Sequence, residues 1–187
     1  MGLEKEKMLT AAEKGDKEAC ASVAEAFLLG QFDGTADYEK AYSWAEQAGD
    51  AKRGRAYTIL GILYLNGYGR PADYEKAEAC LTMAVEAGDM KAPRYLGQMY
   101  AEGLGRESNW REAGKWYRLG ADRGDISSMY MLGRIYEEGL GLEADLEAAV
   151  KWYQKSAVRD DHVGRPSREA LKRLNVPFEQ QRNTERQ

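Results

Sequence analysis

Apolar and small residues recur along this chain at helical spacing, and the whole pattern returns every 36 residues. In residues 92–105, Ala92, Leu96, Gly97 and Tyr100 fall on one stripe of a helix, before a Gly-Leu-Gly break. Two further copies begin near residues 56 and 128, and a degenerate copy lies in residues 19–30. A fixed period of this length predicts an array of helix pairs, in which each pair buries its apolar face against its neighbours.

A second helical stripe follows each break, and a short polar residue precedes it. In the third copy Asn109 stands before this stripe, where its side chain is expected to cap the helix by accepting a backbone N–H. Gly-Asp pairs such as Gly88-Asp89 mark the junctions between copies. Gly97 is expected to lie where a neighbouring helix approaches most closely. The predicted repeats span about 16–49, 50–88, 89–124 and 125–160.

The predicted fold class is all-α, an α/α superhelical solenoid of about four helix pairs. Residues 3–15 and 166–175 are expected to form N- and C-terminal capping helices, the second of which starts with a Pro in its first turn. Because no linker-like stretch interrupts the pattern, we expect one domain over residues 1–175. Residues 176–187 are expected to form a flexible C-terminal tail.

The charge distribution disfavours nucleic acid as a partner. The chain carries 27 Lys and Arg against 31 Asp and Glu, which gives a net charge of −4. Residues 165–187 hold six basic and three acidic side chains, so the rest of the chain is more acidic still.

No apolar stretch approaches the roughly 18 residues that a membrane span requires, and residues 1–7 lack a hydrophobic export signal. We therefore expect a cytoplasmic monomer without membrane insertion.

No pattern in the sequence predicts a catalytic, cofactor-binding or metal-binding site. Cys20 and Cys80 occupy unrelated positions and give neither a disulfide framework nor a metal-ligand spacing. The Gly-x-Gly motifs lack the strand and the Gly-Lys-Ser/Thr of a phosphate loop, so tight turns between helices are expected. His162 has no nucleophile at a recognisable spacing and is expected to be exposed. The aromatic pairs of the second stripes are expected to pack in the core: Trp116, Tyr117, Trp152 and Tyr153.

The third copy reads Ala92-x-x-x-Leu96-Gly97-x-x-Tyr100-x-x-Gly103-x-Gly105, followed by Ala113-x-x-Trp116-Tyr117. This motif resembles the Sel1-like repeat, a relative of the tetratricopeptide repeat, and the resemblance spans roughly residues 19–160. The second copy departs from it at Cys80-Leu81, where the family has Trp-Tyr. The resemblance implies an α/α superhelix and a non-enzymatic adaptor or scaffold role in protein complexes, frequently in bacteria.

A second stripe on each first helix does not repeat, and it is the candidate binding surface. Because the first helices of such arrays line the concave side, these stripes are expected to form one continuous groove for a partner protein or peptide. Exposed aliphatic, aromatic and arginine side chains are typical of interfaces. The predicted partner-binding residues are Leu28, Thr58, Ile62, Leu65, Arg94, Gln98, Tyr130, Arg134 and Glu137.

Two other functions remain open at this point. The same groove would suit an inhibitor or immunity protein that neutralises a toxin or an enzyme. Cysteine-rich relatives linked to β-lactam binding suggest a hydrolase acting on β-lactam or cell-wall substrates. Against the hydrolase, no serine of this chain has a lysine three residues further on, and the regular cysteine pairs are missing.

Overall fold

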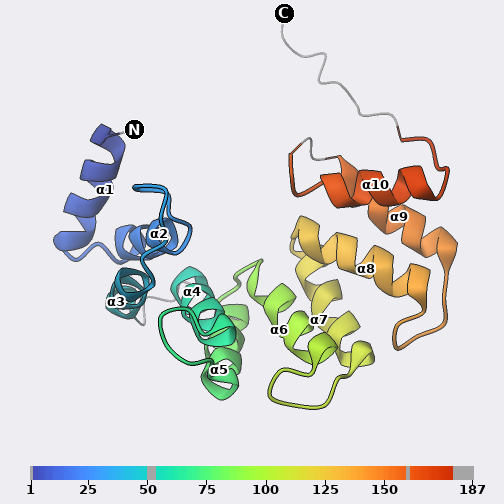
Figure 1. Ribbon diagram of the computed structural model, residues 1–187, viewed down its shortest axis with the longest axis horizontal. Coiled ribbons are helices and arrows are strands. Elements are labelled where there is room, and N and C mark those ends of the chain that lie inside the picture. The colour runs from blue at the N-terminus through green and yellow to red at the C-terminus, as the bar shows by residue number, and fades with distance from the viewer. Residues whose placement is uncertain (1, 50–53, 159–160, 179–187) are drawn as a thin grey trace, which may run out of the picture. The chain divides into compact units, whose positions relative to one another are not determined.

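The computed structural model describes residues 2–49, 54–158 and 161–178. Within these ranges the regular secondary structure consists of ten α-helices and no strand, which confirms the predicted all-α class (Figure 1). The helices are α1 (Gly2–Glu13), α2 (Lys17–Leu28), α3 (Tyr38–Ala48), α4 (Gly54–Asn66), α5 (Tyr74–Glu86), α6 (Ala92–Glu102), α7 (Trp110–Asp122), α8 (Ile126–Glu138), α9 (Leu146–Ala157) and α10 (Arg165–Arg173).

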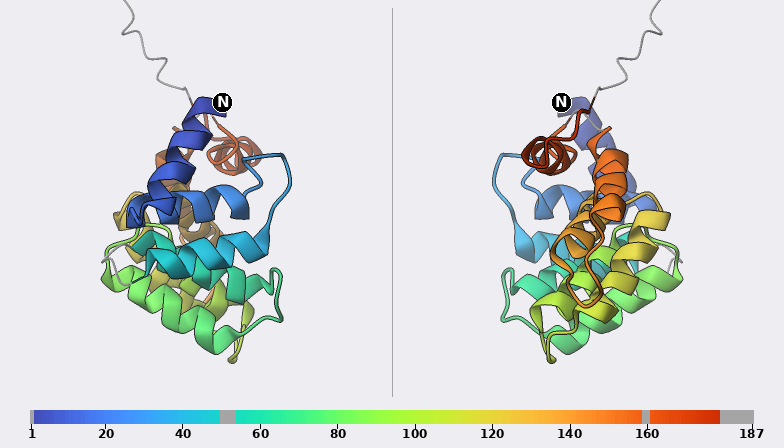
Figure 2. Two further views of the ribbon diagram at one scale, coloured as in Figure 1. Left: turned by 90° about the vertical axis from the view of Figure 1, so that its left-hand side faces the viewer. Right: turned by 90° about the vertical axis from the view of Figure 1, so that its right-hand side faces the viewer.

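The helices form two compact units, each of which is described by itself. Unit 1 comprises Met1–Leu96 and unit 2 comprises Gly97–Gln187, so the boundary falls within α6. In unit 1, α1 packs against α2, α2 pairs with α3, and α4 pairs with α5 and also contacts α2 and α3. In unit 2, α8 packs against both α7 and α9, and α10 packs against α9 (Figure 2). The pairs α2–α3, α4–α5 and α8–α9 therefore form as the repeat pattern predicts.

The predicted caps begin the second helix of each repeat. The side chains of Asp37, Asp73, Asn109 and Asp145 each accept a hydrogen bond from the backbone N–H three residues further on, at 2.9–3.1 Å. This bond satisfies one of the N–H groups that a helix start leaves without a partner. The first residue of the second predicted repeat, Asp50, and the last residue of the fourth, Asp160, lie outside the described residues.

The core of each repeat is built on small residues that let two helices approach. One alanine of each second helix is fully buried at the same register: Ala41, Ala77, Ala113 and Ala149. Opposite them, a Cβ added to Gly97 would lie 2.9 Å from the Tyr117 ring, and one added to Gly133 would overlap the Tyr153 ring. The expectation that Gly97 marks a close approach is therefore confirmed. Tyr117, Trp152 and Tyr153 are buried as predicted, whereas Trp116 is only half-buried.

The Gly-x-Gly motifs are tight turns, as predicted. Both glycines of the Gly139-Leu140-Gly141 motif have a positive φ, 68° and 72°, which side-chain-bearing residues rarely adopt. Gly141 also lies against the start of α7, and a Cβ there would be 2.8 Å from the carbonyl carbon of Trp110. Each such turn thus joins two helices of one repeat, and this one also contacts the preceding repeat.

The packed region extends beyond α10. Val176 and Phe178 are half-buried against a cluster that includes Tyr153 and Leu171. These two residues therefore do not belong to the tail predicted from residue 176, because their apolar side chains cover the end of the last helix pair. Residues 179–187 of that predicted tail lie outside the described residues. Across the described helices, none combines the length and the apolar character needed to cross a membrane.

Candidate functional site

Three of the nine predicted partner-binding residues are buried. Leu28, Thr58 and Leu65 are 9%, 3% and 4% exposed, so their side chains are closed to a partner. The prediction was wrong for these three because it allowed each first helix a single packed stripe. α4 contacts α2, α3 and α5, so a much wider part of its surface is buried. These three residues of the predicted groove therefore belong to the core.

The predicted residues next along the chain are partly exposed but engaged locally. Ile62 packs against the core cluster of unit 1 that contains Leu63, so it too is a core residue more than a surface one. The Arg94 guanidinium donates a hydrogen bond to the Tyr95 hydroxyl at 2.9 Å. In unit 2, the Gln98 amide donates to the Glu102 carboxylate at 3.2 Å. That Arg94 and Gln98 line a groove for a partner stays a prediction.

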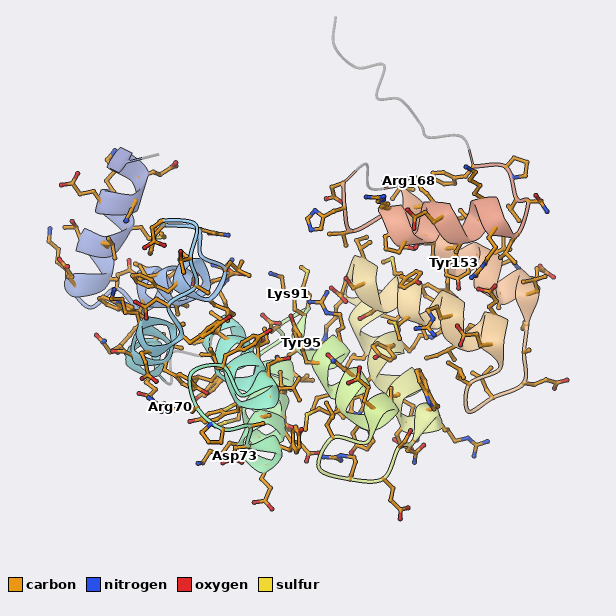
Figure 3. All side chains as sticks on the ribbon, in the orientation of Figure 1. Arg70, Asp73, Lys91, Tyr95, Tyr153 and Arg168 are labelled. Carbon is orange, nitrogen blue, oxygen red and sulfur yellow. The ribbon has the colours of Figure 1, made fainter. Side chains whose placement is uncertain are left out.

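A charged network missed by the prediction lies on the first helices of unit 1. The half-buried carboxylate of Glu25, on α2, lies 3.3 Å from Arg55 Nε on α4 and 3.0 Å from Lys91 Nζ, just before α6 (Figure 3). Arg55 also donates to the Ser22 hydroxyl at 3.1 Å. One carboxylate thus joins three segments of the chain in unit 1.

The remaining three predicted residues form one surface in unit 2, which we call the Tyr130 surface. Tyr130, Arg134 and Glu137 are spaced four and three residues apart, so they share one stripe of α8. All three are half-buried. Arg134 is held by Glu138, with 2.8 Å between Nε and Oε1. This stripe is partly open to solvent, and its side chains are fixed in place.

Glu137 is the most constrained side chain of the Tyr130 surface. Its carboxylate accepts a hydrogen bond from the Tyr153 hydroxyl of α9 at 2.7 Å (Figure 3). It also accepts from the Arg173 guanidinium of α10, 2.7 Å from each carboxylate oxygen. The Tyr130 ring packs on Tyr153, with 5.8 Å between the ring centroids. Three helices thus hold this surface in one arrangement, which lowers the entropy that a partner would have to remove.

Burial sets the protonation of the tyrosine beneath this surface. Burial of Tyr153, and secondly its hydrogen bond to the Glu137 carboxylate, raise the pKa of the phenol above its ordinary value of 10.0. Tyr153 therefore stays neutral and donates to Glu137 at every physiological pH. The Arg173 contact could not be anticipated from the repeat, because Arg173 belongs to the capping helix outside the 36-residue pattern.

The acidic side chains beside a shallow hollow in unit 1 are all engaged in local contacts. The hollow, of about 340 Å³, is lined by residues 33 and 35–39 and by Gly69. The Asp33 carboxylate accepts from the Thr35 N–H at 3.1 Å, Asp37 caps α3, and Glu39 accepts from Arg70. Each carboxylate that lines the hollow therefore serves the local fold.

The residues that could carry reaction chemistry remain scattered. Burial raises the pKa of the Cys20 and Cys80 thiols, which disfavours the reactive thiolate. His162 is exposed, as expected. Within the described ranges, His, Cys, Asp and Glu form no group of three that could hold a metal ion.

The repeats match a known family along most of their length. Residues 17–52, 54–89, 92–125 and 126–160 each match the Sel1 repeat, and together they make up more than half of the chain. The chain belongs to the Sel1 repeat family. The four matched segments agree closely with the helix pairs α2–α3, α4–α5, α6–α7 and α8–α9.

Solved structures of Sel1 repeat proteins share this fold. A Sel1 repeat protein from Oxalobacter formigenes has a TM-score of 0.72 and 24% identity, over 90% of this chain and 74% of that chain. A protective antigen present in uropathogenic Escherichia coli strains has a TM-score of 0.71 and 28% identity, over 92% of this chain and 37% of that chain. An immunity protein from Pseudomonas aeruginosa has a TM-score of 0.51 and 18% identity, over 81% and 71%. A comparison with curated proteins gives no match.

Proposed function

We propose that this Sel1 repeat protein is a non-enzymatic adaptor or scaffold that binds a partner protein or peptide on the Tyr130 surface of unit 2. Helix-pair repeats use the extended face of their first helices for binding, and α8 is the first helix of the fourth repeat. α8 packs against α7 and α9, and the Tyr130 surface, although it contacts Tyr153 of α9, stays partly open to solvent.

The observation that carries the proposal is the fixed placement of Tyr130 and Arg134 at positions that differ from repeat to repeat. Tyr130 corresponds to Thr58 and Arg94 of the two preceding repeats, so the residue at this position is not part of the repeated motif. Tyrosine and arginine contribute most of the binding energy in many interfaces. Held by Tyr153 and Glu138, they require little further ordering when a partner binds.

An inhibitor or immunity role would use the same surface. One solved protein of this fold is an immunity protein, but at 18% identity that likeness concerns the fold alone. The two roles differ in what happens to the partner: an adaptor leaves its activity intact, and an inhibitor abolishes it. Once the partner is identified, its activity with and without this protein distinguishes them.

Site-specific photo-crosslinking tests the proposal and identifies the partner in the same experiment. Tyr130 is replaced by the photoreactive residue benzoylphenylalanine, which keeps an aromatic ring at that position. In a matched control the same residue replaces Tyr74, which is 37% exposed on α5 of unit 1. After illumination of cells that produce each variant, we expect one covalent protein adduct from position 130, and mass spectrometry then identifies the partner.

The control makes this result specific to the surface. The same adducts from both positions would indicate random collision, and an adduct from position 74 alone would move the binding surface to the second helices. Either outcome contradicts the proposal.

A further inference from the structure

Two basic side chains contact the ring of one tryptophan on the second helices of unit 2. Arg118 of α7 lies with its guanidinium carbon 4.8 Å from the centroid of the Trp152 ring, and Lys155 of α9 lies with its ammonium 4.3 Å from the same centroid. The two charges are therefore no farther apart than the sum of these distances. The indole is 8% exposed, whereas Arg118 and Lys155 are both exposed.

These two cations differ from their neighbours in how they are held. On the same two helices, Lys115 pairs with Glu112 and Lys151 pairs with Glu147, each at 2.6 Å. Among the described residues, no carboxylate pairs with Arg118 or with Lys155. Arg118 donates instead to the Tyr136 hydroxyl at 2.9 Å. The attraction between a cation and an aromatic face orients both charges without neutralising them.

Among the residues that the structure describes, this arrangement of two cations on one aromatic ring occurs once. When the second helices are aligned on their caps, Trp152 corresponds to Trp44, Cys80 and Trp116, so the tryptophan recurs in three of the four repeats. The cations do not. The position of Arg118 holds other residues elsewhere: Glu46, Thr82 and Gln154. The position of Lys155 likewise varies: Gln47, Met83 and Leu119. Positions that escape the packing pattern are those at which a repeat protein varies its surface.

We propose that Arg118 and Lys155 form a second binding surface, which takes an acidic segment of a partner protein through two neighbouring Asp or Glu carboxylates. Trp152 limits the orientations of both cations, so binding costs little side-chain entropy. A phosphate backbone fits this surface less well, because Glu112, Asp122 and Glu147 lie on the same two helices and would repel an extended polyanion. This surface differs from the Tyr130 surface and does not depend on it.

Charge-matched double variants test this inference. Arg118→Gln with Lys155→Gln removes the two cations over Trp152, and Lys115→Gln with Lys151→Gln removes two paired cations from the same helices. The probe is a fluorescein-labelled hexaglutamate peptide, whose anisotropy is followed at low ionic strength. We expect the first pair to weaken binding roughly tenfold and the second pair to change it by less than about twofold.

Two further measurements keep the outcome decisive. Glutamine preserves much of the stem that covers Trp152, and circular dichroism checks the fold of each variant. In the wild-type protein, the Trp152 indole N–H resonance, assigned with Trp152→Phe, is expected to shift with hexaglutamate and not with hexaglutamine. The inference would be overturned by equal loss of binding in both double variants, or by an indole signal that does not move. It would also be overturned if oligothymidylate bound more tightly than hexaglutamate and depended in the same way on Arg118 and Lys155.

Discussion

Gly133→Ala is expected to lower the free energy of unfolding by about 1–3 kcal/mol, although alanine is the better helix former. The added Cβ would stand 2.5 Å from Cδ1 of the Tyr153 ring. That ring cannot turn away easily, because its hydroxyl is bonded to Glu137 and its face packs on Tyr130. The clash would thus be relieved by separating α8 from α9. Urea unfolding followed by circular dichroism measures the cost.

Gly114→Ala supplies the matched control within the same unit. Gly114 also lies inside a helix, α7, but a Cβ there would have Ile135 Cδ1 as its nearest neighbour at 3.9 Å, an ordinary contact. This variant is expected to raise the free energy of unfolding by about 0.5–1 kcal/mol, through helix propensity alone. If both variants stabilised the protein to the same extent, the close approach of Gly133 and Tyr153 would be refuted.

Tyr153→Phe and Tyr42→Phe are expected to change stability in opposite directions. Tyr153→Phe loses the bond to the Glu137 carboxylate and should lower the free energy of unfolding by about 1.5–3 kcal/mol, as for hydrogen bonds to charged groups. The Tyr42 hydroxyl is buried and has no hydrogen-bond partner among the described residues. Tyr42→Phe should therefore raise stability by about 1 kcal/mol. Thermal and urea unfolding of both variants measures the difference.

The two phenols also predict how stability falls at alkaline pH. Burial, before all other causes, raises the pKa of Tyr42 from 10.0 to about 12, and it raises the pKa of Tyr153 as well. The stability that follows from these raised pKa values is complete below pH 10, where the phenols of the unfolded chain remain protonated. It is lost as the pH rises from 10 through the pKa values of the two phenols in the folded protein. Tyr42→Phe should make this loss shallower. An alkaline profile identical to that of the wild type would argue against a buried Tyr42 phenol.

The fold could be predicted from the sequence where each feature is local. Caps such as Asp145 depend only on the residues that follow them, and a glycine inside an apolar helical stripe, such as Gly133, indicates a close helix contact. The burial of Thr58 and Leu65 could not be read in this way. It depends on how many helices surround α4, which the 36-residue period does not specify.

Part of the candidate site could also be predicted from the sequence, because it depends on the local geometry of one helix. Tyr130, Arg134 and Glu137 follow from helical geometry once the packed stripe of α8 is known. The contact between Glu137 and Arg173 depends on where α10 packs, and the convergence of Arg118 and Lys155 on Trp152 depends on the spacing of α7 and α9. Such contacts between elements become visible only in three dimensions.

The most direct measurement of the binding claim compares Arg134→Ala with Arg165→Ala on the partner identified by crosslinking. Both changes delete one arginine from an i,i+4 pair with glutamate, since the Arg134–Glu138 and Arg165–Glu169 distances are 2.8 and 2.9 Å. Both should cost about 0.5 kcal/mol or less in stability, so a difference in binding reports the surface alone. Isothermal titration calorimetry gives the Kd of each variant.

If the Tyr130 surface binds the partner, Arg134→Ala should weaken binding by about 2 kcal/mol or more, roughly thirtyfold in Kd, while Arg165→Ala leaves it unchanged. The same Kd for wild type, Arg134→Ala and Arg165→Ala would contradict the account and place the binding surface elsewhere on the protein.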